Sequence, residues 1–453
     1  MTKVRTPTPS QPPSRRAPSR RDITALAAAA VAAPFVAVPG RAQSSQPTLK
    51  IAKWAHFLPE YDAWFADELA AEWGRQHDTK VVVDVIPAER IHAAATAEVT
   101  AGTGHDLFMF PWPPAEFQQH VIDHAEIYQK VAFRYGTLDR FSQLSSFDPR
   151  AKKYFAFVDS WVPAAVHYYQ DYWAEVGMPF GPLTWGSLLS GGMRLKAARG
   201  VACGLAFGSG LESNITCHTL LYAFRAHILD VAGNVTMGLN ALTVAALNYA
   251  KKLYDLTGTP DQLAWGPRGN VEAMLARKTS LTINPISLLR TAEKDNPEAA
   301  SKIRLCPPLM GHAGQFALPY ATNCSAVWNF AQNQDGAKLF LADLIGSSTI
   351  AYEKSGGCNF PTYQKTVPNL IVRLAEDPKA DPHGKYVELK DAAYWTRNMG
   401  FPSYANPVGM EVFNSLVIPR MFASVITGQS SAHDAAQAAA AEVTRIAERW
   451  KDT

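Results

Sequence analysis

Apolar and polar residues along this chain alternate in two periods, one typical of strands and one typical of helices. Residues 48–54, 80–86 and 107–110 are short β-rich runs. Between them, apolar residues recur at helical spacing over 61–75, and a second helical pattern covers 91–100. Strands that alternate with helices indicate an α/β protein with mostly parallel sheets.

The same alternation continues through the rest of the chain. It predicts further strands at 154–166, 201–207 and 279–283. Helices are predicted at 185–199, 240–256, 271–277, after Asn284-Pro285, from 333 or 334 to 344, and at 431–450. The opening β-α-β-α-β order resembles half of a doubly wound sheet. In such sheets ligands bind beyond the carboxyl ends of the strands.

The first 42 residues have the pattern of a secretory signal rather than of a folded element. Arg20-Arg21 precede an apolar run over 23–38, and Gly40-Arg41-Ala42 follow it. The run is 16 residues long and contains Pro34, so it is too short to anchor the chain in a bilayer. The paired arginines indicate twin-arginine export. We expect a periplasmic protein that begins near Gln43; an uncleaved anchor is the disfavoured alternative.

Removing this segment changes the charge of the chain. The whole sequence has a formal net charge of +3, but the first 42 residues contain seven basic residues and one acidic residue, so the remainder has a net charge of −3. Charge therefore gives no reason to expect a nucleic-acid partner. The remaining 411 residues are enough for two or three domains with sizeable cores.

Five cysteines lie in the predicted mature chain, so at least one is unpaired in an oxidising compartment. The sequence leaves room for one disulfide, and spacing does not give its pairing. The absence of C-x-x-C disfavours a zinc site or a thioredoxin-like pair. These cysteines are Cys203, Cys217, Cys306, Cys324 and Cys358.

The chain contains no motif for nucleotide or metal chemistry. It has neither G-x-x-x-x-G-K-[ST] nor G-x-G-x-x-G opening a helix. His120 and His124 are four residues apart, as metal ligands on a helix can be, but H-E-x-x-H is absent and two surface histidines are the commoner interpretation. We therefore expect no cofactor and no bound metal.

Aromatic and polar residues gather where predicted strands end and helices begin. Aromatic faces suit the C–H face of a sugar ring, while amide, carboxylate and imidazole groups orient hydroxyls. For most of the rings, core packing is the alternative; for Asp106 it is capping of a turn, and for Asn284 capping of a helix. The candidate ligand-binding residues are Trp54, His56, Asp106, Trp112, Trp161, Trp265, Asn284, Tyr394 and Trp395.

Five segments, in order along the chain, resemble the family 1 extracellular solute-binding proteins of ABC importers, the group that contains the maltose-type binding proteins. Residues 49–54 resemble the family's first strand, and 101–107 its small-Gly-x-Gly-x-Asp turn. Residues 183–188 resemble its Thr-Trp-x-x-Leu helix start, 273–281 its short helix and strand, and 426–441 its closing helix. One departure is Arg277-Lys278 in place of the usual Gly-Lys.

The resemblance implies a two-lobed periplasmic binding protein fold of type II, with a ligand cleft between two doubly wound lobes. One lobe would be 43–163 with 306–332, and the other 166–303 with 335–453. The chain would cross between them near Trp161–Pro163 and again near Cys306-Pro307-Pro308.

The implied function is capture of a sugar, polyol or similar polar small molecule by a monomeric importer subunit, which delivers it to an ABC permease. Two alternatives remain at this point. One is a periplasmic enzyme exported with a cofactor, and the other is a binding protein that acts mainly as a ligand sensor.

Overall fold

The computed structural model describes residues 46–208, 210–237 and 241–451. The predicted export signal, its cleavage site and the predicted helix start at Asn240 lie outside these ranges. No helix among the described residues is long and apolar enough to cross a membrane.

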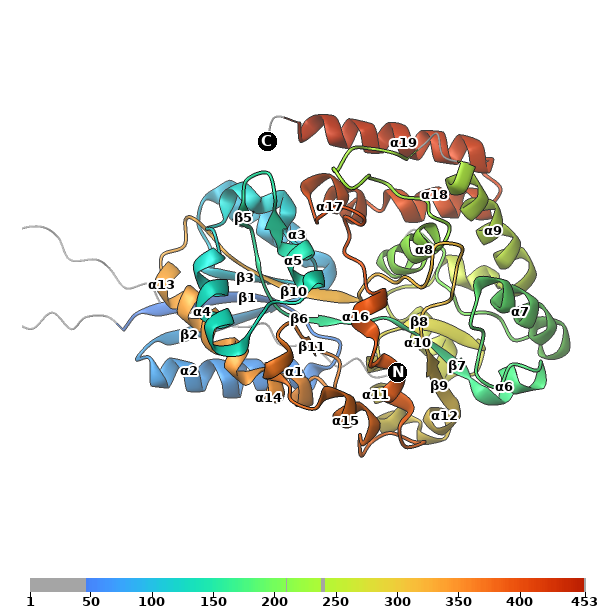
Figure 1. Ribbon diagram of the computed structural model, residues 1–453, viewed down its shortest axis with the longest axis horizontal. Helices are drawn as coiled ribbons and strands as arrows, with labels where there is room; N and C mark the ends of the chain where they lie inside the picture. Colours follow the sequence, from blue (N-terminus) through green and yellow to red (C-terminus); the bar gives the residue numbers. More distant parts are fainter. Residues whose placement is uncertain (1–45, 209, 238–240, 452–453) are drawn as a thin grey trace, which may run out of the picture. The chain divides into compact units, whose positions relative to one another are not determined.

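A six-stranded mixed sheet organises the first lobe (Figure 1), with strands in the order β11-β6-β10-β3-β1-β2. The strands β2, β1 and β3 run parallel, whereas β10 is antiparallel to β3 and β6, and β11 is antiparallel to β6. Their bounds are β1 Thr48–Trp54, β2 Lys80–Ile86, β3 Leu107–Phe110, β6 Phe157–Val162, β10 Ala321–Val327 and β11 Phe360–Pro361.

The side chains of strand β1 alternate between the two buried clusters that cover the faces of the first lobe's sheet. Leu49 and Ile51 face one buried cluster, and Ala52 and Trp54 face the other, because successive side chains of a strand point to opposite faces. Helices α1, α2, α4 and α13 contribute to the first cluster, and α3 and α5 to the second. Their bounds are α1 Pro59–Ala63, α2 Ala71–Gln76, α3 Ala88–Ala101, α4 Ala125–Tyr135, α5 Arg140–Ser146 and α13 Gln334–Leu344.

The second lobe is built on a three-stranded sheet in the order β8-β7-β9, with both pairs antiparallel. Its strands are β7 Ala165–Tyr169, β8 Leu281–Asn284 and β9 Ile303–Cys306. Longer helices pack beside it and against one another. They are α7 Trp185–Arg199, α8 Leu211–Ala223, α9 Ala241–Thr257, α18 Val417–Ile426 and α19 Ala432–Arg449, with the shorter α6 Gln170–Glu175, α10 Gly269–Leu275, α11 Ser287–Asp295 and α12 Pro297–Lys302.

Side chains cap the starts of two helices in the second lobe. Thr184 caps α7 in a capping box, in which its hydroxyl accepts from the backbone N–H of Ser187 and the Ser187 hydroxyl accepts from the backbone N–H of Thr184. The Ser431 side chain accepts from the N–H of Asp434 at the start of α19. Between α1 and α2, the predicted helix is continuous but adopts a π-helix over Trp64–Ala70.

The chain passes from the first sheet to the second between β6 and β7, and returns between β9 and β10. The packing differs from the predicted lobe boundary at residue 335. Helix α13 packs against α4, and β11 pairs with β6, so the segment from α13 to β11 belongs to the first sheet's surroundings. Local periodicity predicts a helix there but does not indicate which sheet covers its apolar face.

Two other features differ from the sequence-based expectation. Parallel pairing between named strands is confined to β2-β1-β3. The predicted strand at 201–207 is a single bridge between Ala202 and Thr279. The rest of this segment is buried but makes no ladder. Burial stabilises apolar residues whether or not the segment pairs as a strand, so a short apolar run does not by itself identify a strand.

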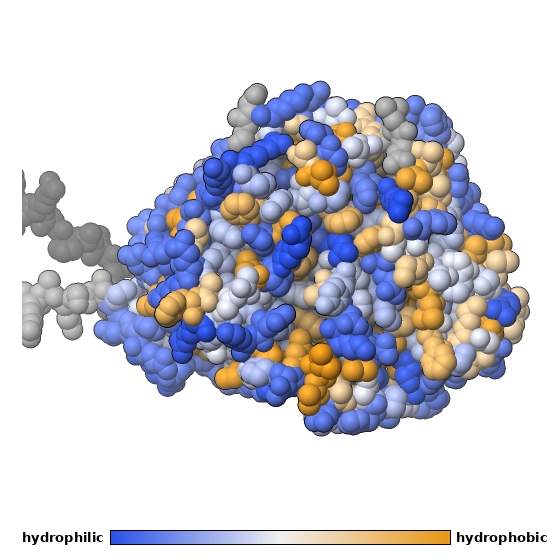
Figure 2. Space-filling model, viewed as in Figure 1, coloured by the Kyte–Doolittle hydropathy of each residue, from blue (hydrophilic) through white to orange (hydrophobic). Residues whose placement is uncertain are grey.

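The face seen in Figure 2 is predominantly hydrophilic, with apolar residues gathered in small, separate patches. Scattered apolar groups of this kind are normal on protein surfaces.

Candidate functional site

A cavity of about 330 Å³ lies between the two lobes, and residues of both line it. We call it the polar chamber. The first lobe contributes the segments that follow β1 and β3, and the second lobe contributes the end of β8 and the start of α8. The carboxyl ends of the parallel strands β1 and β3 therefore open on the chamber, as expected for an open α/β sheet.

Aromatic rings form the first-lobe wall of the polar chamber. Trp54 is 3% exposed, and its indole N–H donates to Asn323 Oδ1 at 3.0 Å. Phe57 packs edge-on against Trp54, with ring centroids 5.2 Å apart, and edge-on against Tyr320, at 6.3 Å. Trp112 is half-buried and also lines the chamber. These rings offer an apolar surface that is held in place by packing.

His56 lines the chamber, but its ring nitrogens are already engaged. Nδ1 accepts from the backbone N–H of Leu58 at 3.1 Å, so the proton lies on Nε2, which donates to Asn359 Oδ1 at 3.1 Å. Burial, with a smaller effect of the Lys53 charge, lowers the pKa of His56 to about 3. The imidazole is therefore neutral at physiological pH and holds the loop after β1 in place.

The floor of the polar chamber carries polar groups with spare hydrogen-bonding capacity. Asn284 is 4% exposed, and its Nδ2 has no hydrogen-bond partner among the described residues. The hydroxyl oxygen of Tyr320 lies 2.7 Å from the Ile283 carbonyl and 3.2 Å from Glu212 Oε2. A buried amide without a partner costs free energy, which a bound hydroxyl would recover.

Burial raises the pKa of Glu212 to about 7, although the bond with Tyr320 acts in the opposite direction. The single Tyr320 proton has a closer acceptor in the Ile283 carbonyl, so a protonated Glu212 can donate to the phenol oxygen. Burial thus brings the pKa of a carboxyl that lines the polar chamber close to neutral pH.

Four predicted site residues line the polar chamber: Trp54, His56, Trp112 and Asn284. Five do not, and for them the predicted cleft position needs correction. Asp106 lies at the amino end of β3, where it accepts from the backbone N–H groups of Lys50 (2.9 Å) and Asn333 (2.8 Å). It closes a turn at the far end of the strand, which was the alternative that the sequence left open.

The other four corrections concern aromatic residues. Trp161 is in β6, packed against Phe141 and Phe360. Trp265 is half-buried, donates to Asp261 at 3.3 Å and packs over Gly269, while its neighbours Pro267 and Arg268 line the chamber. Tyr394 is 80% exposed and Trp395 is 4% exposed, both on α16 Ala392–Trp395 and outside the chamber lining.

Sequence reasoning missed Glu212, Arg268 and Tyr320 as lining residues. Glu212 follows Gly210-Leu211 at the start of α8, and Tyr320 follows Pro319 just before β10, so both also stand at element junctions. A search for aromatic clusters overlooks a lone carboxylate in such a position.

Two expectations about the histidines and cysteines need correction: His124 is not at the surface, and no cysteine is paired. His124 is buried, with Nδ1 bonded to the Tyr154 carbonyl and Nε2 accepting from Val327. Among the described residues, no group of three His, Cys, Asp or Glu side chains could hold a metal ion. All five cysteines are buried and free, so the disulfide that the sequence allowed is not formed.

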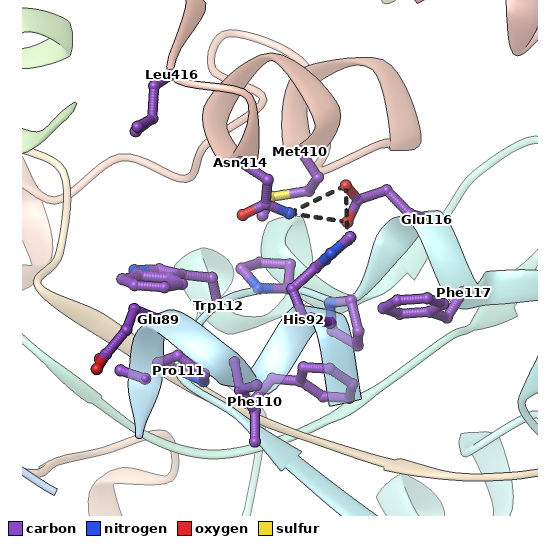
Figure 3. A pocket seen from close by; sticks show the side chains of 15 residues that line it. Glu89, His92, Phe110, Pro111, Trp112, Glu116, Phe117, Met410, Asn414 and Leu416 are labelled. Atoms are coloured by element: carbon purple, nitrogen blue, oxygen red, sulfur yellow. Dashed lines mark hydrogen bonds and ion pairs between the residues drawn. The ribbon is translucent and has the colours of Figure 1, made fainter. Parts of the chain in front are cut away.

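A second cavity, of about 280 Å³, adjoins the first, and we call it the second chamber (Figure 3). The two chambers share Ala88, Glu89, Pro111 and Trp112. The second chamber is lined by the rings of Phe110, Trp112 and Phe117 and by Met410, and Figure 3 shows Asn414 bonded to Glu116 at its edge. Met410 and Asn414 come from α17 Pro407–Asn414.

No protein-family model and no curated protein sequence matches this chain. Solved structures do. A maltose-bound protein from T. maritima has a TM-score of 0.71 and 17% identity, with 88% of this chain and 99% of that chain covered. A sugar transporter protein from Arthrobacter chlorophenolicus with bound laminaribiose has a TM-score of 0.73 and 16% identity over 88% and 99%.

An ABC transporter solute-binding protein from Agrobacterium radiobacter in complex with ribitol has a TM-score of 0.67 and 19% identity, over 88% of this chain and 98% of that chain. These neighbours span nearly the whole described chain, and each matches over both lobes. The chain therefore has the two-lobed fold of the maltose-type solute-binding proteins of ABC transporters.

Proposed function

We propose that this protein is the solute-binding subunit of an ABC importer, and that it captures a sugar or polyol between its two lobes. The observation that carries the proposal is the polar chamber, which combines aromatic walls from the first lobe with the unpartnered Asn284 amide and the Glu212 carboxyl of the second. Neighbours of the same fold bind maltose, laminaribiose and ribitol. The protein's role is binding, and its partner would be a membrane permease.

The residues that line the polar chamber come from both lobes, and this explains how ligand binding would close the lobes. Phe57 and Trp112 belong to the first lobe, and Asn284 and Glu212 to the second. A ligand that stacks on the first pair and bonds to the second gains contacts in the closed form that it lacks in an open one. Such differential contacts shift the population toward closure.

The test of this function is a thermal-shift screen across mono- and disaccharides, polyols and small anions. A ligand that binds only the folded state raises apparent stability by RT ln(1 + [L]/Kd), so a hundredfold excess over Kd adds about 2.7 kcal/mol. A shift with sugars or polyols, confirmed by calorimetry, supports the proposal. A shift confined to small anions, or none with any member of the panel, would refute it.

Replacing Trp112 with alanine should weaken sugar binding by about 1–3 kcal/mol, the range found when an aromatic ring that stacks on a flat ligand is removed. Trp265→Ala is the matched control, because Trp265 is half-buried but lies outside the chamber lining. Calorimetry should show a loss for the first variant and an unchanged Kd for the second. The reverse pattern would move the site to the segment around Trp265.

We also propose export to the periplasm in a folded form, by the twin-arginine route. The five buried thiols support it, since an oxidising compartment favours disulfides in a chain that folds there. Burial raises the pKa of the Cys203 thiol to about 11 and that of Cys358 to about 12, so both thiols are un-ionised and unreactive in the folded state. Folding before export would conceal all five.

Changing both Arg20 and Arg21 to lysine should leave the precursor in the cytoplasm, and wild-type periplasmic protein should start near Gln43. Alkylation of that protein should modify none of its thiols when native and all five after denaturation, as counted by mass spectrometry. Normal export of the double variant, or a disulfide in the periplasmic protein, would contradict folded export.

A further inference from the structure

Glu212 is a half-buried carboxyl that lines the polar chamber without a cationic partner. Its Oε2 lies 3.2 Å from the hydroxyl oxygen of Tyr320, whose own proton has a closer acceptor in the Ile283 carbonyl, at 2.7 Å. Among the described residues, no lysine, arginine or histidine forms an ion pair with Glu212. The protein therefore leaves most of the hydrogen-bonding capacity of this carboxyl unused.

Several other buried or half-buried carboxyls of the chain are compensated. Glu293 and Asp377 bond to the guanidinium of Arg290, and Asp106 accepts from two backbone N–H groups. A desolvated carboxylate that lacks such partners is costly, unless a bound molecule supplies the missing donors. Because Glu212 faces a cavity between the lobes, a ligand can supply them.

The other charges of the polar chamber cancel each other. Glu89 on α3 and Arg268, just before α10, line the chamber with exposed side chains of opposite charge. The His56 imidazole is neutral and adds no charge. An ionised Glu212 therefore gives the chamber lining a net negative charge, which favours a cationic group in the ligand.

Two neighbouring features fit a ligand that carries an ammonium group beside hydroxyls. The Tyr320 ring adjoins Glu212, and the Phe57 ring packs edge-on against it; aromatic rings attract cations. Asn284 is 4% exposed, and its Nδ2 donor has no partner among the described residues. A hydroxyl oxygen accepts from such a donor, whereas an ammonium group has no lone pair to do so. The chamber thus needs a cationic donor and neutral oxygen acceptors in one molecule.

We propose that the ligand is an amino sugar or amino polyol, whose ammonium group pairs with Glu212 and whose hydroxyl oxygens accept from Asn284. The inference rests on the proposed sugar-binding function and names the ligand class within it. An ammonium group brings a positive charge and several donors, whereas a hydroxyl brings one donor and no charge. Charge-assisted hydrogen bonds are also the stronger kind, so Glu212 discriminates in favour of the amine.

The test compares glucose, galactose, mannose and sorbitol with their amino derivatives, titrated by calorimetry into the exported protein at pH 7. The derivatives are the 2-amino-2-deoxy sugars, 1-amino-1-deoxysorbitol and the N-acetyl form of each. The amino compound that binds best should bind about tenfold or more tightly than its hydroxyl parent. N-acetylation removes the charge and should abolish this preference.

Glu212→Gln should reduce the ratio of amino-compound to parent affinity to within about twofold, because glutamine has nearly the same shape and no charge. Glu89→Gln is the matched control. Glu89 lines the same chamber but is exposed, so solvent screens its charge, and the variant should keep at least about half of the wild-type ratio.

Proton release gives a second readout that does not depend on the affinity ratio. Burial raises the pKa of Glu212 to about 7, so at pH 7 part of the population carries a proton on this carboxyl. An ammonium group bound beside it lowers that pKa and displaces the proton. Calorimetry in buffers of different ionisation enthalpy should therefore show that an amino compound releases more protons from the wild type than from Glu212→Gln.

The possible failures are distinguishable. Equal affinity for amino compounds and their parents overturns the amino-sugar inference and leaves sugar binding intact. A preference that survives Glu212→Gln, or that Glu89→Gln removes equally, overturns the assignment to Glu212, as does equal proton release from the wild type and Glu212→Gln. Failure of every amino compound and every neutral sugar or polyol to bind overturns the proposed function, and the inference with it.

Discussion

Replacing Arg290 with methionine should lower the free energy of unfolding by about 3–5 kcal/mol, the usual cost of removing one partner from a buried charge network. The Arg290 side chain is 7% exposed, and its guanidinium bonds to Asp377 at 2.5 Å and 3.2 Å and to Glu293 at 2.9 Å. Nε also donates to the Gly356 carbonyl at 2.5 Å, and the group lies 4.3 Å from the ring centre of Tyr386.

Removing Arg290 leaves the two carboxylates buried with fewer partners. Glu293 keeps Lys385 as a partner, with the ammonium 3.0 Å away, but Asp377 loses its main ion-pair partner. Arg199→Met is the control, because the Arg199–Glu175 pair is exposed and should be worth less than about 1 kcal/mol. Urea unfolding of both variants measures the difference. A loss below 1 kcal/mol for Arg290→Met would show that the network is solvated in solution.

Glu212→Gln should raise the free energy of unfolding by about 2–3 kcal/mol at pH 8 and have little effect at pH 4. The reason is the raised pKa of this carboxyl, about 7 against its ordinary 4.5. A carboxyl with a raised pKa in the folded state binds its proton more tightly there than in the unfolded chain. Its ionisation therefore costs stability progressively between pH 4.5 and 7, at about 1.4 kcal/mol per pH unit at most.

Glutamine has nearly the same shape, stays neutral, and can still donate to Tyr320, so it removes the ionisation cost without leaving a cavity. Asp159 and Asp139 also have raised pKa values, of about 7 and about 6, but they are present in both proteins and cancel in the comparison. The exposed Glu126 supplies the control variant Glu126→Gln. Equal stability differences at pH 4 and pH 8 would mean that Glu212 does not titrate in this range.

The first-lobe strands could be predicted because they are local features. Thr48–Trp54, Lys80–Ile86 and Leu107–Phe110 coincide with the predicted runs. The resemblance to maltose-type binding proteins gave the two-lobed fold. The pairing of β11 with β6 could not be predicted, since it joins residues about two hundred positions apart whose short runs carry no register information.

The site was predicted only in part, for a physical reason. A position next to a strand does not reveal which end of the sheet it occupies, and Asp106 lies at the amino end whereas Trp112 lies at the carboxyl end. An aromatic residue at a junction serves equally well as core, as Trp161 and Trp395 do. Glu212 and Tyr320 are 108 residues apart in the sequence and come together only on folding. No local sequence pattern therefore indicates that they are close in space.

The central claim is that a sugar or polyol binds between the two lobes and draws them together. Small-angle X-ray scattering of the exported protein, with and without a saturating ligand identified by calorimetry, tests it most directly. Closure of the lobes around the ligand should give a smaller radius of gyration in the complex. An unchanged radius at confirmed saturation would contradict closure around the ligand, and with it the assignment of the polar chamber as the binding site.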